Sequence, residues 1–111
     1  VDSNTLVSNL RGGYIERHTV DLGTKTFSMY VSVLENGKLS TYDVLFRSVS
    51  YFSFADNQAG DWDRLELTDL WVDALPAASS TEEWEVTMSL WDLAQVKVRC
   101  SGIALDGEVV R

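Results

Sequence analysis

The sequence predicts a mainly β protein: a single domain over residues 1–111, built as an antiparallel β-sandwich or a strongly curled sheet with a short N-terminal helix. Three observations lead to this prediction. Apolar and polar residues alternate with a period of two along much of the chain, which is typical of strands with one buried face. An Asn-Gly dipeptide joins two of these segments, as in tight hairpins. The length is that of one domain, and no linker or repeat divides it.

The first element is the one segment with a helical pattern, Ser3–Leu10. The stop signal Gly12-Gly13 follows it, and a strand is expected over Tyr14–Leu22. The apolar residues of the helix fall on one stripe, which predicts that this stripe faces the core: Leu6, Val7 and Leu10.

The second element is a hairpin over Thr26–Phe46. Its Asn36-Gly37 dipeptide suits a type I′ turn, because both central residues of that turn need a positive φ. A two-residue loop there sets the register, and apolar residues then meet on one face: Phe27 opposite Phe46, Met29 opposite Val44 and Val31 opposite Tyr42.

A second hairpin is expected near the C-terminus, around the connection Trp91–Gln95. The alternation places Cys100 among the core residues, which argues against a nucleophilic thiol. Glu85, Lys97 and Arg99 share the outer face, where opposite charges suit a wet sheet surface. The five-residue connection predicts the register: Met88 opposite Val98 and Val86 opposite Cys100.

Three interruptions of the alternation each predict a bulge or a short turn. They lie between Phe46 and Val49, between Leu67 and Leu70, and at Gly102.

The charge of the chain restricts its partners. Seventeen Asp and Glu against nine Lys and Arg give a net charge of −8, which argues against nucleic acid, because phosphate binding needs a basic surface. The segment Asp56–Asp92 holds ten acidic residues and a single base, Arg64, and so carries the whole imbalance. Two interpretations stay open: a surface that keeps the protein soluble, or one that meets a basic partner or a cation.

The cellular compartment is inferred from what the sequence lacks. No apolar run approaches the ~18 residues of a membrane-spanning helix, and no basic-then-apolar leader begins the chain. The lone Cys100 cannot form an internal disulfide, which fits a reducing compartment. We therefore expect a cytoplasmic protein without a membrane partner.

The sequence contains little evidence of a catalytic site. The only histidine, His18, lies on a predicted strand beside polar residues, and no Gly-x-Ser-x-Gly elbow is present. One His and one Cys do not make the usual zinc site. We expect no enzyme activity, no cofactor and no metal, with a small hydrolase around His18 as a weaker alternative. The loop Asp56–Asp63 holds oxygen-bearing side chains that calcium could use, but its spacing is not that of an EF-hand and its residues also suit an ordinary turn.

The four tryptophans also bear on function. Trp84 is in phase with the core, whereas Trp71 and Trp91 are out of phase and fall on the opposite face. A second buried face and a ligand platform explain these outward tryptophans equally well.

Acidic residues gather around Trp62 and Trp84. A patch that mixes carboxylates with an aromatic anchor suits a hot spot for Lys- and Arg-rich surfaces. The predicted partner-binding residues are Asp61, Trp62, Asp63, Glu66, Glu82 and Glu83.

The order of features resembles a known group of proteins. A short helix leads into Gly13-Tyr14-Ile15, and a hairpin then precedes the segments Val44–Tyr51, Trp62–Leu67 and Val96–Cys100. This arrangement is similar to the small bacterial β-rich domains of the YxiG type, some of which are grouped with the immunity proteins of polymorphic-toxin loci. The resemblance covers most of the chain and implies a cytosolic binding protein with no catalytic residues to carry over.

The expected function is therefore a non-enzymatic protein-binding module of immunity type, which presents an acidic surface to a basic protein. The alternative is a β-sandwich that binds a glycan through exposed tryptophans, with or without calcium. Salt-sensitive binding to a basic protein favours the first, and tryptophan quenching by glycans or calcium favours the second.

Overall fold

The computed structural model describes residues 3–57, 60–76 and 82–110, which form one helix and nine strands. In chain order these are α1 (Ser3–Leu10), β1 (Tyr14–Asp21), β2 (Thr26–Glu35), β3 (Lys38–Arg47), β4 (Tyr51–Asp56), β5 (Asp69–Ala74), β6 (Trp84–Leu90), β7 (Ala94–Cys100), β8 (Gly102–Leu105) and β9 (Glu108–Val109).

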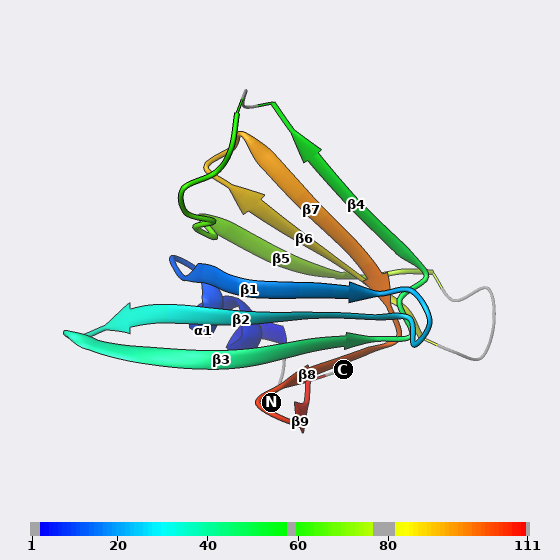
Figure 1. The fold of residues 1–111 in the computed structure, drawn as a ribbon. Coiled ribbons are helices and arrows are strands. Elements are labelled where there is room, and N and C mark those ends of the chain that lie inside the picture. The colour runs from blue at the N-terminus through cyan, green and yellow to red at the C-terminus, as the bar shows by residue number, and fades with distance from the viewer. Residues whose placement is uncertain (1–2, 58–59, 77–81, 111) are drawn as a thin grey trace.

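The strands form two antiparallel sheets. The first has the order β1-β2-β3-β8-β9 and the second the order β4-β7-β6-β5. Figure 1 shows them as a wedge-shaped sandwich, joined where β3 leads into β4 and β7 leads into β8. The predicted fold class is confirmed, as are the helix and the first strand, which ends one residue earlier than expected.

The two sheets meet at a corner where neighbouring strands bend together. β3 pairs with β8 in the first sheet, and β4 pairs with β7 in the second. At the corner Arg47 lies opposite Gly102, Ser48 has a φ of 52°, and the Ser101 amide donates a hydrogen bond to the Arg47 carbonyl (3.2 Å). Two of the predicted interruptions, after Phe46 and at Gly102, therefore belong to one structural feature.

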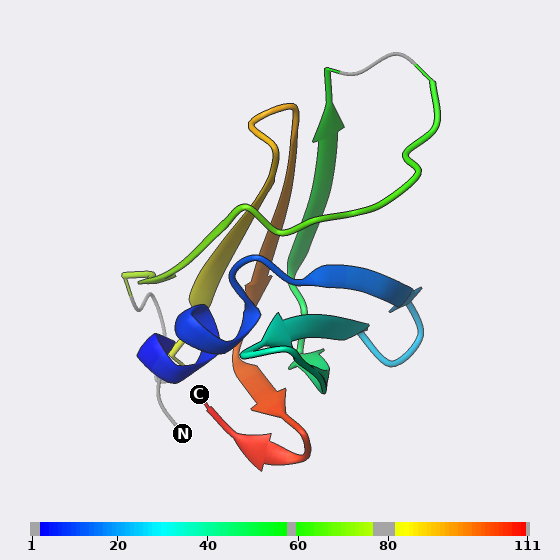
Figure 2. The ribbon, with the colours of Figure 1, turned by 90° about the vertical axis from the view of Figure 1, so that its left-hand side faces the viewer.

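α1 closes one side of the sandwich (Figure 2). Leu6 and Leu10 are fully buried there, as the apolar stripe predicted. Gly13 then lets the chain pass close to β2, because a Cβ at this position would lie 2.7 Å from Val31 Cγ1 and 2.8 Å from Val33 Cγ2. Gly13 is therefore needed for close packing, besides following the end of the helix.

The first hairpin has the predicted register. Glu35 pairs with Lys38 and Met29 with Val44, and the turn residues Asn36 and Gly37 have φ of 50° and 78°. The two signals that predicted it, the turn dipeptide and the matched apolar faces, are independent, so their agreement specifies a single pairing.

The predicted register of the second hairpin is wrong by two residues. Val98 pairs with Val86, and Cys100 pairs with Trp84, which is only partly buried. The loop has three residues, 91–93, because Trp91 and Asp92 both adopt positive φ (56° and 55°) and the Leu93 amide closes the turn on the Leu90 carbonyl (3.0 Å). A two-residue shift leaves every side chain on its predicted face.

The outer face of this hairpin carries the expected charge pairs. Arg99 Nε donates a hydrogen bond to Glu85 Oε2 (2.7 Å), and Lys97 Nζ lies 3.7 Å from Glu85 Oε1. The hydrogen bond from Arg99, followed by the charges of both bases, lowers the pKa of Glu85.

The prediction that Cys100 belongs to the core is confirmed, because its side chain is fully buried. Burial raises the pKa of this thiol from 9.0 to about 11. The unfolded chain thus loses its thiol proton at lower pH than the folded chain, and the free energy of unfolding should fall as the pH rises from about 9 to about 11. At neutral pH a thiol reagent should label the protein only after denaturant is added, and rapid stoichiometric labelling of the folded protein would contradict this account.

Candidate functional site

The sandwich is open along one side, between two edge strands. β1 ends the first sheet and β4 ends the second, and both lie on the side away from α1 (Figure 1, Figure 2). Within the described part of the chain, these two strands do not pair with each other, and no strand covers the outer edge of β4. The gap between the sheets is therefore accessible from this side.

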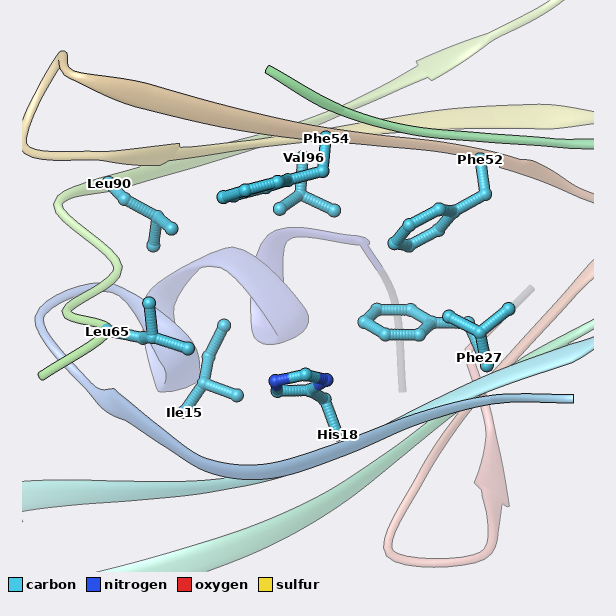
Figure 3. A pocket seen from close by; sticks show the side chains of 9 residues that line it. Ile15, His18, Phe27, Phe52, Phe54, Leu65, Leu90 and Val96 are labelled. Carbon is cyan, nitrogen blue, oxygen red and sulfur yellow. The ribbon is translucent and has the colours of Figure 1, made fainter. Parts of the chain in front are cut away.

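The open side leads into an apolar cleft of about 370 Å³ (Figure 3). This volume lies in the ~300–1,000 Å³ range of protein ligand pockets. Leu65 and Leu90 lie at one end of the cleft, and the other lining residues come from both sheets: Ile15, His18, Val20, Phe27, Phe52, Phe54 and Val96.

A β-bulge determines which residues of β1 face the cleft. The pairing of β1 with β2 shifts between Ile15 and Arg17, so that Glu16 is the extra residue. A bulge interrupts the alternation of a strand, and here Ile15 and His18 both point into the cleft (Figure 3). His18 has aromatic and aliphatic neighbours there.

Two phenylalanines of β4 form the opposite wall. Phe52 and Phe54 point into the cleft, yet they keep 36% and 52% of their surface exposed. The Phe52 ring packs on Phe27 at 5.0 Å between centroids, and Phe27 stacks on the buried Phe46 at 5.6 Å. The cleft therefore joins the core at its base and presents apolar aromatic surface at its mouth.

An acidic hollow of about 280 Å³ adjoins the end of the cleft at Ile15 and Leu65, which line both spaces. The chain closes this end because the Ile15 amide donates a hydrogen bond to the Leu65 carbonyl (2.8 Å). The other residues that line the hollow are Tyr14, Glu16, Trp62, Asp63 and Arg64. They provide two carboxylates, an indole and a guanidinium. The guanidinium carbon of Arg64 lies 4.8 Å from the centroid of the Tyr14 ring.

The structure brings together four of the six predicted partner-binding residues. The connection from β4 to β5 holds Asp61, Trp62, Asp63 and Glu66. It passes the start of β1, where Glu66 forms an isolated antiparallel β-bridge with Tyr14. Asp61 and Asp63 are exposed and Glu66 is partly buried. The remaining predicted interruption, between Leu67 and Leu70, lies where this connection ends and β5 begins.

Glu82 and Glu83 lie elsewhere. They precede Trp84 at the start of β6, while Trp62 is held beside the end of β4 through a hydrogen bond from its Nε1 to Asp56 Oδ2 (2.8 Å). Asp56 lies opposite Ala94, the first residue of β7. Trp84 lies opposite Cys100, the last residue of β7. The six residues therefore do not form one patch.

In the loop considered for calcium, Asp56 already has a protein partner, because its carboxylate accepts a hydrogen bond from Trp62 Nε1. Gln58 and Ala59 of that loop lie outside the described residues. In the part that is described, no three His, Cys, Asp or Glu side chains gather as metal ligands.

Trp71 lies on the outer face of the second sheet, as predicted, and is 41% exposed. Trp91 is 56% exposed, but it lies in the turn between β6 and β7 and not on a strand face. Sequence reasoning missed Phe52, Phe54 and His18 as lining residues. The apolar run at the start of β4 was the one available signal, and the bulge that turns His18 inward has no glycine to mark it.

No family model matches the chain, and no curated protein matches it. In the described residues, no helix is long and apolar enough to cross a membrane.

Proposed function

We propose that this domain is a non-enzymatic binding module that holds an extended, basic and apolar segment of a protein partner. Apolar side chains of the segment enter the cleft, and a Lys or Arg reaches the acidic hollow. The observation that carries this proposal is that the two spaces adjoin each other and share Ile15 and Leu65 as lining residues. The hollow holds two carboxylates against one guanidinium, so a ligand that reaches both spaces would combine apolar and cationic groups.

The distribution of polar groups favours a protein segment over a small apolar molecule. Small-molecule pockets usually place several polar groups inside an apolar cavity to orient the ligand. Here His18 is the one polar side chain among the lining residues of the cleft. The other polar groups are the backbone amides and carbonyls of the bordering edge strands, which are groups that a polypeptide satisfies best.

The charge of the chain supports a basic partner. A net charge of −8 attracts cationic surfaces over a distance, and such steering raises association rates more than final affinity. The narrower form of the proposal is an immunity-type protein of the cytoplasm, whose partner is a basic toxin. In that case the domain acts by covering a basic surface, which needs complementary shape and charge but no catalysis.

A selection from a phage-displayed random peptide library tests the proposal. The full chain is immobilised, and peptides that bind the bare support are removed beforehand. We expect enrichment of peptides that join alternating apolar residues to Lys or Arg. The proposal fails if no peptide is enriched, or if the enriched peptides lack basic residues or bind the Phe54→Ser variant equally well.

Neutralising the acidic end of the cleft should slow association. In the Asp61→Asn, Asp63→Asn, Glu66→Gln variant we expect the association rate of a selected peptide to fall about 3–10-fold at low salt, and less at physiological salt, where the screening length is ~8 Å. Stopped-flow fluorescence measures the rate.

The matched control is the Glu82→Gln, Glu83→Gln variant, which removes charge at the far end of β6. It should retain most of the wild-type association rate. Equal rates for both variants would show that the carboxylates near Trp62 have no specific role and serve solubility alone.

Glycan binding is a second candidate function, favoured by a separate hollow of about 320 Å³ on the outer face of the second sheet. Trp71 lines it together with Asn57, Asp92 and Gln95, and an aromatic face beside hydrogen-bonding groups suits a sugar ring. Titration with soluble oligosaccharides should then quench tryptophan fluorescence in the wild type and not in Trp71→Ser. Equal quenching in both proteins, or none in either, would remove this candidate.

A further inference from the structure

We infer that the partner segment binds as an additional β-strand on the outer edge of β4, extending the second sheet across the mouth of the cleft. This inference rests on the proposed function and specifies how the segment is held. It is carried by three features of β4: the direction of its free backbone groups, the absence of edge protection, and the position of its phenylalanines.

The backbone direction follows from the pairing of β4 with β7. The Asn57 amide donates a hydrogen bond to the Leu93 carbonyl (2.8 Å). These two residues follow directly on the last pair of the β4–β7 ladder and continue its register. Backbone groups of successive residues in a strand point to opposite edges. The amides and carbonyls of Ser53 and Ala55 therefore face β7, and those of Phe52 and Phe54 face the open edge.

Within the described residues, the outer edge of β4 from Tyr51 to Ala55 lacks the features that usually protect an edge strand. Natural edges carry charged side chains, lysine above all, proline, a bulge or a covering segment, and the one charged residue of β4 is its last, Asp56, which accepts a hydrogen bond from Trp62. The six residues Tyr51–Asp56 contain neither lysine nor proline, and their pairing with β7 runs without a register shift. β1 shows the contrast, since it has a bulge at Glu16 and is covered at its start by the hydrogen bond to Leu65.

The side chains of β4 identify what an added strand would contribute. Phe52 and Phe54 offer their backbone to the edge and their rings to the cleft (Figure 3). Every second side chain of a new strand would enter the cleft beside these rings, at about 7 Å intervals along the strand. The cleft thus selects for apolar residues at alternate positions, while the hollow at Glu16 and Asp63 selects for a basic residue beyond them.

A second copy of the chain is a poorer occupant of this edge. Two chains of net charge −8 repel each other, and the β4 strand that a copy would supply has no basic residue for the hollow. The negative charge around the edge of β4 therefore favours a basic segment of another protein over a second copy of this chain.

Backbone methylation of the most strongly enriched library peptide tests the inference. Two versions are synthesised, with N-methyl groups on odd or on even residues of the apolar stretch. Because only alternate residues of an added strand donate to β4, one version should lose affinity by about 30-fold or more, and the other should bind nearly as well as the parent. Similar affinities for both versions would overturn strand addition while leaving the proposed function in place.

Amide hydrogen exchange of the full chain supplies a second readout. The unmodified peptide should slow exchange at Phe52 and Phe54, whereas Ser53 and Ala55 should exchange slowly with or without it. Unchanged exchange at the two phenylalanine amides would contradict strand addition. Concentration-dependent protection of the same amides in the peptide-free protein would assign the edge to a second copy and equally overturn it. If the library returns no peptide, the proposed function itself has failed.

Discussion

In chemical denaturation, the Phe46→Ala variant is expected to lose about 3–5 kcal/mol of its free energy of unfolding. Phe46 is fully buried on β3, where it lies between Phe27 of β2 and Ile103 of β8 in the ladder. Its ring also stacks on Phe27. Truncation removes contacts from both neighbouring strands and leaves a cavity in a region that two hairpins hold in place.

The matched control is Phe54→Ala, which removes the same side chain from a position that is 52% exposed. We expect it to cost about 1 kcal/mol, because half of the ring is already in water. Equal losses for the two variants would mean that the cleft is closed and its phenylalanines belong to the core.

Replacing Phe54 with serine is expected to weaken binding of a selected peptide by about 30-fold or more, the effect of losing one hot-spot residue of ~2 kcal/mol. The ring lies at the mouth of the cleft and combines exposure with contact to the apolar interior. Isothermal titration calorimetry measures the dissociation constant, and circular dichroism checks that the variant is folded.

Trp71→Ser is the matched control for this variant. It removes another half-exposed aromatic side chain, 41% exposed, from the opposite face of the same sheet. Peptide affinity should be unchanged in Trp71→Ser. A reversed result, with affinity lost at Trp71 and kept at Phe54, would place the binding surface on the outer face.

The two hairpins show how far the sequence determines this fold. Asn36-Gly37 specifies a loop length, so the alternation around it has one register, and that register is observed. The second loop has no such dipeptide. Alternation alone is unchanged by a two-residue shift, so the faces were predicted correctly while the pairing of Val86 with Val98 was not.

The candidate site was only partly predictable. Trp62 and Asp63 were found because an aromatic residue among carboxylates is visible in the sequence. The cleft depends on which strands end each sheet, and β4 pairs with β7, about 40 residues further along the chain. Local patterns do not reveal such a long-range pairing, nor the bulge at Glu16 that turns His18 inward.

Nuclear magnetic resonance of the labelled full chain, titrated with a selected peptide, tests the central claim most directly. We expect the largest shift changes at the His18, Phe52 and Phe54 rings, which line the cleft, and at the Trp62 indole, which lines the adjoining acidic hollow. The indole signals of Trp71, on the outer face, and of Trp91, in the turn after β6, should stay in place. Large changes at those two indoles, with the cleft signals unmoved, would contradict this claim.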